Sequence, residues 1–120
     1  MKLITKDIER KLKANQYAMD KADEMGIDFS IANRKPVVKL FNPVGAGTWF
    51  LFSMNEAGHA YGWAKISDGE YGWVDVNSLQ ELDVGFHLGI ERDLHYSPLT
   101  FKETAEMWGC LLYTSPSPRD

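Results

Sequence analysis

The stretch Thr48-Trp-Phe-Leu-Phe-Ser-Met54 decides the fold that the sequence predicts. Most of its residues are apolar, and aromatic side chains are enriched in β-strands. Alternate residues of a strand face opposite sides of a sheet, so a run that is apolar on both sides predicts a strand covered on both faces. We therefore expect residues 48–54 to form a central strand.

Three further apolar runs flank this strand. Val37-Val-Lys-Leu-Phe41 precedes it, and residues 60–66 and 71–76 follow it. The turns between the runs contain glycine, asparagine, serine or aspartate, which are typical turn residues. Parallel pairing needs long crossover connections, and these turns are short. The four strands are therefore predicted to form an antiparallel meander.

Helical patterns occur before the strands. Thr5 is a suitable N-cap, because its hydroxyl can accept a hydrogen bond from a free amide at the start of a helix. Residues 6–14 are predicted to form an amphipathic helix, and two interpretations stay open for residues 15–35. The helix continues as far as Gly26, or the segment is a long surface loop. The apolar residues at helical spacing are Leu3, Ile4, Ile8 and Leu12.

Two later segments carry the capping-box pattern, in which two side chains each accept from the other residue's amide. Ser78-Leu-Gln-Glu81 predicts a short helix with Leu79 and Leu82 packed on the sheet, and Thr100-Phe-Lys-Glu103 predicts a helix as far as Trp108. The predicted class is α+β. It has an antiparallel sheet of about four to five strands, an N-terminal helix, a short helix after the fourth strand and a C-terminal helix.

The composition is that of one globular domain, for which we expect residues 1–109. The chain has 120 residues, of which 44% are hydrophobic and 25% charged, with a formal net charge of −4. A nucleic-acid binder needs a basic face, so we expect no direct nucleic-acid partner. The chain has a single cysteine, and no apolar run approaches the roughly 20 residues of a membrane span. Its charged N-terminus is unlike a signal peptide. We therefore expect a cytoplasmic protein with no membrane partner.

The sequence from Cys110 to Asp120 differs in character from the rest. It resembles a translated adapter or a chimeric junction of assembled environmental DNA, which would carry no evolved function. A natural disordered tail is the alternative, since serine and proline dominate its end. Either interpretation places residues 110–120 outside the domain.

The stretch Gly85-Phe-His-Leu-Gly-Ile-Glu-Arg-Asp-Leu-His-Tyr-Ser-Pro98 concentrates the most chemistry. In an extended conformation Glu91, Asp93 and His95 point to one face, and carboxylate and imidazole groups can bind a metal ion together. The spacing is common by chance, so we favour a solvated face over a metal site. Elsewhere we find neither a Gly-x-Ser-x-Gly elbow nor a phosphate-binding loop. We therefore expect no catalytic residues, no metal and no cofactor.

Arg92 falls on the opposite face of the same stretch, with Ile90, Leu94 and Tyr96. A partly buried guanidinium needs acceptors, from a carboxylate or from backbone carbonyl oxygens. We expect Arg92 to tie the last strand to the sheet, and an anion-binding arginine is the alternative.

Aromatic residues crowd the predicted strands. Most of them are expected to fill the core, but tyrosine and tryptophan are also favoured at protein interfaces. One exposed aromatic group beside acidic side chains would form a protein-binding surface. The candidate contact residues are Trp63, Asp68, Glu70, Trp73 and Asp75.

Several motifs occur together: an N-terminal Leu-Ile-Thr-Lys-x-Ile, Phe41-Asn-Pro43, Thr48-Trp49 and Gly89-Ile-Glu-Arg-Asp-Leu94. In this combination the chain resembles domain-of-unknown-function family 2958, over about residues 1–106. Members are small proteins of bacteria, phages, plasmids and integrative elements. The resemblance implies no enzyme activity and no catalytic residues. Its structural signature in this chain consists of Phe41, Trp49, Glu91, Arg92 and Asp93.

The resemblance also implies a mobile-element setting, in which small acidic proteins often block host defence. We therefore expect a non-enzymatic protein-binding module, namely an inhibitor of anti-CRISPR type that occludes a nucleic-acid-binding surface. Its partner would be a host protein such as a CRISPR nuclease or its guide complex. One alternative is a small metal- or ligand-dependent enzyme centred on Glu91, Arg92, Asp93 and His95. Another is a regulator of plasmid maintenance.

Overall fold

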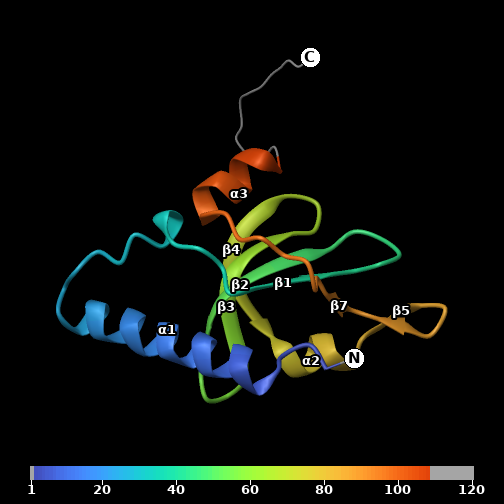
Figure 1. Ribbon diagram of the computed structural model, residues 1–120, viewed down its shortest axis with the longest axis horizontal. Coiled ribbons are helices and arrows are strands. Elements are labelled where there is room, and N and C mark those ends of the chain that lie inside the picture. Colours follow the sequence, from blue (N-terminus) through green and yellow to red (C-terminus); the bar gives the residue numbers. More distant parts are fainter. Residues whose placement is uncertain (1, 109–120) are drawn as a thin grey trace, which may run out of the picture.

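A five-stranded antiparallel sheet, ordered β4-β3-β2-β1-β7, organises the chain (Figure 1). The structure is a computed structural model that describes residues 2–108, so the predicted tail at residues 110–120 lies outside the described residues. The predicted α+β class and the antiparallel meander are confirmed. The strands are β1 (Val38–Phe41), β2 (Thr48–Met54), β3 (His59–Lys65), β4 (Gly69–Asp75) and β7 (Glu91–Arg92).

The strand β2 is buried along its whole length, as its apolar sequence predicts. It separates two cores, one on each face of the sheet. Trp49 and Leu51 point into the first core, whereas Phe50 and Phe52 point into the second. The first core is completed by the N-terminal segment and by the helix that follows β4. The second core is completed by Phe101 and by partly buried residues that include Phe29, Tyr96 and Trp108.

A β-bulge interrupts β2 between Leu51 and Ser53, where its register against β3 shifts. A bulge leaves backbone groups of the extra residue without a ladder partner. The side chain of Asn15 meets this need, because its Nδ2 donates to the Phe52 carbonyl oxygen at 2.8 Å. This polar contact ties the middle of the N-terminal helix to the centre of the sheet.

The N-terminal helix α1 (Lys6–Glu24) takes the longer of its two possible lengths. Thr5 is its N-cap and accepts from the Ile8 amide at 3.2 Å, and Gly26 follows its end with a φ of +69°. Leu12 packs in the first core and Met19 against the second. The helix therefore crosses from one face of the sheet to the other, and Figure 1 shows it along one end of the strands. The loop after it contains a short 3-10 helix, η1 (Ile31–Asn33).

The second helix α2 (Val76–Glu81) begins earlier than its sequence predicts. The N-cap is Asp75 instead of Ser78, because Asp75 Oδ1 accepts from the amides of Asn77 and Ser78 at 3.0 and 3.4 Å. Leu79 is buried as expected, but the helix ends before Leu82, which is exposed. The predicted packing of Leu82 on the sheet is therefore wrong.

The C-terminal helix α3 (Phe101–Met107) has the predicted capping box. Thr100 Oγ1 accepts from the Glu103 amide at 3.1 Å, and Glu103 Oε1 accepts from the Thr100 amide at 3.0 Å. Phe101 then enters the second core. The hydrogen bonds that Glu103 Oε1 accepts from the Thr100 amide and hydroxyl lower the pKa of the Glu103 carboxyl.

A small hairpin of β5 (Asp83–Gly85) and β6 (Leu88–Gly89) extends beside the sheet and was missed by the sequence analysis. Its turn places two non-glycine residues at positive φ, Phe86 at 57° and His87 at 60°. Phe86 is 88% exposed at the tip. Within residues 2–108, none of the helices has the length and apolar character needed to cross a membrane.

Candidate functional site

The predicted contact residues do not share one surface. Trp63 is only 3% exposed and packs against Phe50 in the second core, so its assignment to a binding surface is wrong. The side chain of Trp63 in β3 is covered by α3 and by the segments next to α3. The periodicity of the strand alone does not reveal this cover. Trp73 in contrast is 55% exposed.

The acidic candidates also separate. Asp75 uses its carboxylate to cap α2, and this role occupies the side chain. Glu70 alternates with Tyr71 along β4 and therefore lies on the opposite face of the sheet from Trp73. Asp68 is exposed in the turn between β3 and β4. Asp68, Glu70 and Trp73 are exposed, but Glu70 does not share a face of the sheet with Trp73.

The structure assembles a different group around Trp73, formed by Tyr61, Tyr71 and Trp73, which we call the aromatic patch. The ring centroids of Tyr61 and Trp73 are 5.1 Å apart, and those of Tyr61 and Tyr71 lie stacked at 6.2 Å. Tyr71 also contacts Phe101 of α3 at 5.7 Å and is 38% exposed. Partial burial raises the pKa of Tyr71, with a smaller contribution from Tyr61. The aromatic patch therefore packs against the second core through the contact of Tyr71 with Phe101.

The opposite face of the same strands is hollow. Gly62 of β3 pairs with Gly72 of β4, and with Ala64 they leave a cavity of about 220 Å³. Trp49 and Leu51 of β2 form part of its lining. Gly72 and Ala64 leave this surface of the sheet unfilled, because a Cβ at Gly72 would meet no described atom within 4 Å and Ala64 carries only a methyl group.

Arg92 of β7 lies beside the N-terminal segment of the chain. Its Nη1 donates to the carbonyl oxygens of Lys2 at 2.6 Å and Leu3 at 3.0 Å. These acceptors belong to the residues just before α1, so Arg92 ties β7 to the N-terminal segment. Ile90, on the same face, is buried in the first core.

Glu91, Asp93 and His95 do not come together as ligands for a metal ion. Asp93 Oδ2 pairs with Lys39 Nζ at 3.5 Å, and Asp93 Oδ1 accepts from the backbone amide of His95 at 2.9 Å. The strand β7 ends at Arg92, so the alternation used to align these residues does not continue. Among residues 2–108, no group of three or more histidine, cysteine, aspartate or glutamate residues is placed to hold a metal ion.

A cavity of about 200 Å³ lies beside this ion pair. Lys39 Nζ sits 5.8 Å from the Phe50 ring centroid and 5.6 Å from that of Trp108. The buried hydroxyl of Tyr96 has no hydrogen-bond partner among residues 2–108. Burial, assisted by the charge of Asp93, raises the pKa of Tyr96 to about 12. The cavity lies between β1, β2 and α3. Aromatic packing in the second core explains why Phe50, Tyr96 and Trp108 line it.

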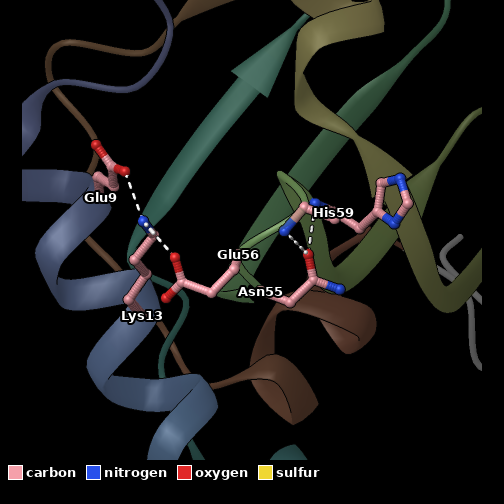
Figure 2. A network of polar contacts seen from close by, with 6 residues as sticks. Glu9, Lys13, Asn55, Glu56 and His59 are labelled. Atoms are coloured by element: carbon pink, nitrogen blue, oxygen red, sulfur yellow. Dashed lines mark hydrogen bonds and ion pairs between the residues drawn. The ribbon is translucent and has the colours of Figure 1, made fainter.

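A cavity of about 550 Å³ lies between α1, the β2–β3 turn and α2. Figure 2 shows Lys13 between two carboxylates, Glu9 at 2.9 Å and Glu56 at 3.2 Å. The lysine hydrogen bond lowers the pKa of Glu9, and the two carboxylates raise the pKa of Lys13. All three groups are solvent-accessible, so this cluster links α1 to the turn with a small energetic effect.

The turn beside that cavity is held by Asn55. Its Oδ1 accepts from the backbone amides of Ala57 and His59, both at 3.0 Å (Figure 2). The His59 imidazole forms no part of this contact. The polar groups drawn together here are satisfied by one another, and the cavity presents no concentrated charge of either sign.

The aromatic patch contains two residues that the sequence analysis did not select, Tyr61 and Tyr71. Strand parity was the available signal, because Tyr71 and Trp73 share one face of β4 and Tyr61 pairs opposite Trp73. Parity also places Trp63 on this face, opposite Tyr71. Only the position of α3 distinguishes the covered end from the exposed end, and that depends on tertiary packing.

Comparison with protein-family models matches residues 3–109 to the family described as "Protein of unknown function (DUF2958)". Comparisons with curated proteins and with solved structures give no match. The matched region covers the sheet, its helices and the signature residues from Phe41 to Asp93. The chain belongs to the DUF2958 family.

Proposed function

We propose that this chain is a protein-binding module and that its contact surface is the aromatic patch of Tyr61, Tyr71 and Trp73. The observation that carries the proposal is the exposure of Trp73 at 55% in a packed ring cluster. Aromatic side chains held this way lose little conformational freedom on binding, which is why they dominate interface energetics.

The bracing of the patch supports this role. Tyr71 rests on Phe101, and Tyr61 lies against both other rings, so the three side chains are pre-positioned before any partner arrives. Pre-organisation lowers the entropy cost of association. Trp73 is the most exposed of the rings that carry the proposal, and we assign it the largest share of the binding energy.

The charge of the chain favours a basic partner. The formal net charge is −4, and the exposed carboxylate of Asp68 lies in the turn of the β3–β4 hairpin that carries the patch. Complementary charge speeds encounter and selects partners more than it adds affinity. The nucleic-acid channel of a host protein has the matching basic character.

We further propose the narrower role of an inhibitor of anti-CRISPR type that acts in the bacterial cytoplasm. The mobile-element setting implied by the family resemblance motivates it. The inhibitor would cover the surface on which a CRISPR nuclease or its guide complex binds DNA. No nucleic acid need contact the chain itself, in keeping with its acidic charge.

A phage or plasmid protection assay in hosts with different CRISPR systems tests the proposal. We expect the wild-type chain to restore infection or transformation against at least one system, and Trp73→Ala to lose this effect. Tyr17→Ala is the matched control, because Tyr17 is a 65% exposed aromatic residue on α1 whose ring is not among those in contact with Tyr61, Tyr71 or Trp73. Lack of protection in every system, or equal protection by Trp73→Ala, would refute the narrower role.

A further inference from the structure

We propose that β4 pairs antiparallel with β4 of a second copy of the chain, joining two five-stranded sheets into one continuous sheet. The two-fold axis passes beside Gly72. This inference is independent of the proposed function, because it concerns the edge of the strand and not the identity of a host partner.

The strand β4 is an unprotected edge. It forms one end of the sheet, and within the described part of the chain it pairs only with β3. Natural edge strands are usually blunted by proline, by charged side chains and above all lysine, by a bulge or by short length. This edge is seven residues long, Gly69-Glu-Tyr-Gly-Trp-Val-Asp75, with no proline or lysine, and its register against β3 has no shift.

The backbone groups on this edge are available in an alternating pattern. The Val76 amide donates to the Gly58 carbonyl oxygen at 3.1 Å, one step beyond the paired residues His59 and Asp75. In an antiparallel ladder every second residue makes such bonds to its neighbour. The backbone groups of Tyr71 and Trp73 therefore point away from β3, toward the open edge.

Self-pairing about Gly72 uses these groups completely. Tyr71 falls opposite Trp73 of the second copy in a hydrogen-bonded pair, and the reverse pair forms on the other side of the axis. Gly69 falls opposite Asp75 of the second copy at the two ends of the paired segment. The outward amide and carbonyl groups of Tyr71 and Trp73 thereby gain partners in both copies.

The side chains are complementary in this register. Glu70 faces Val74 of the second copy, and Asp75 faces Gly69, so no like charges lie directly opposite each other. Like charges in such positions would destabilise the pair, whereas aromatic cross-strand pairs stabilise it. The Tyr71 and Trp73 rings of both copies lie on one face, so the aromatic patch continues across the axis.

The position of Gly72 provides a direct test. The two Gly72 residues form the non-hydrogen-bonded pair at the axis, where Cα atoms are about 4.5 Å apart. Disulfides form at Cα separations of about 4.4–6.8 Å. A Cβ at Gly72 would meet no atom of residues 2–108 within 4 Å, so this part of the fold accepts a side chain there. The chain has a single cysteine, Cys110, which is first replaced by serine.

In the Cys110→Ser background, Gly72→Cys should form a covalent dimer under mild oxidation, seen by non-reducing electrophoresis. Ala57→Cys, at an exposed position in the β2–β3 turn, is the control and should remain a monomer. Sedimentation of the wild-type chain should show a dimer at micromolar concentration. A wild-type chain that stays monomeric up to millimolar concentration, or equal cross-linking by Ala57→Cys, would overturn the proposal.

Charge reversal gives a second measurement. Gly72→Lys and Gly72→Glu each place like charges across the axis, so each variant alone should sediment as a monomer with an unchanged circular dichroism spectrum. An equimolar mixture should recover the dimer, because lysine then faces glutamate. Dimers of unchanged affinity in either single variant would contradict this register.

Discussion

Replacing Gly62 with alanine should destabilise the protein much more than the same replacement at Gly72, although the two glycines face each other across β3 and β4. Neither has a positive φ, so backbone preference does not separate them. Their surroundings do. A methyl group at Gly62 would overlap the Phe50 carbonyl oxygen and lie 2.9 Å from the Leu51 Cα, whereas at Gly72 it meets nothing within 4 Å.

The magnitude follows from what must move. A glycine replaced by alanine at a compatible position gains about 0.4–1 kcal/mol, chiefly through the unfolded chain. At Gly62 the clash is with backbone atoms of the buried strand β2, and relief requires β3 to shift away from it. Forced shifts in a packed core cost about 1–3 kcal/mol or more. We expect the free energy of unfolding of Gly62→Ala to be about 3 kcal/mol lower than that of Gly72→Ala.

Urea unfolding followed by tryptophan fluorescence, at one fixed protein concentration, measures this difference. Thermal melting gives a second reading, with a separation of roughly 10 °C for a chain of this size. If Gly62→Ala were as stable as Gly72→Ala, the close approach of β3 to β2 at the bulge, and with it the described register, would be wrong.

Three further substitutions test separate contacts. Arg92→Ala should lower the free energy of unfolding by about 2 kcal/mol and speed amide exchange at Leu3, because two carbonyl oxygens lose a charged donor; unchanged exchange would contradict the tie. Tyr96→Phe should stabilise the protein by about 1 kcal/mol at pH 7, since it removes a buried hydroxyl that has no partner among the described residues. Because the folded-state pKa of Tyr96 is raised to about 12, the wild type should lose stability relative to Tyr96→Phe between about pH 10 and 12, and a constant difference over that range would refute the burial of the hydroxyl. Thr100→Ala should cost about 1 kcal/mol through loss of the N-cap of α3, measurable by urea unfolding, and no loss would rule out the capping box.

The strands were predictable because local chemistry defines them. An apolar run bounded by turn residues specifies β2 wherever it lies, and the Thr100–Glu103 pattern specifies the start of α3 without reference to the rest of the chain. The start of α2 was mispredicted since Ser78 and Asp75 are both good caps, and only the end of β4 decides which residue precedes the helix.

The candidate site was less predictable, because it depends on which side chains of the sheet are covered by other elements. Trp63 and Trp73 have similar neighbours in sequence and share one face of the sheet, yet α3 and its surroundings bury the first and leave the second exposed. The hairpin of β5 and β6 escaped prediction for a local reason. Its turn is made by Phe86 and His87 at positive φ, where sequence rules expect glycine, asparagine or aspartate.

We propose that the aromatic patch binds a protein and thereby blocks the access of that protein to nucleic acid. The most direct measurement is target-DNA binding by purified CRISPR nuclease–guide complexes of several types, with increasing amounts of the wild-type chain, Trp73→Ala or Tyr17→Ala. A binding hot spot contributes about 2 kcal/mol or more, so Trp73→Ala should need roughly 30-fold more protein for equal inhibition while Tyr17→Ala matches the wild type. Undiminished DNA binding by every complex, or equal inhibition by all three proteins, would contradict the claim.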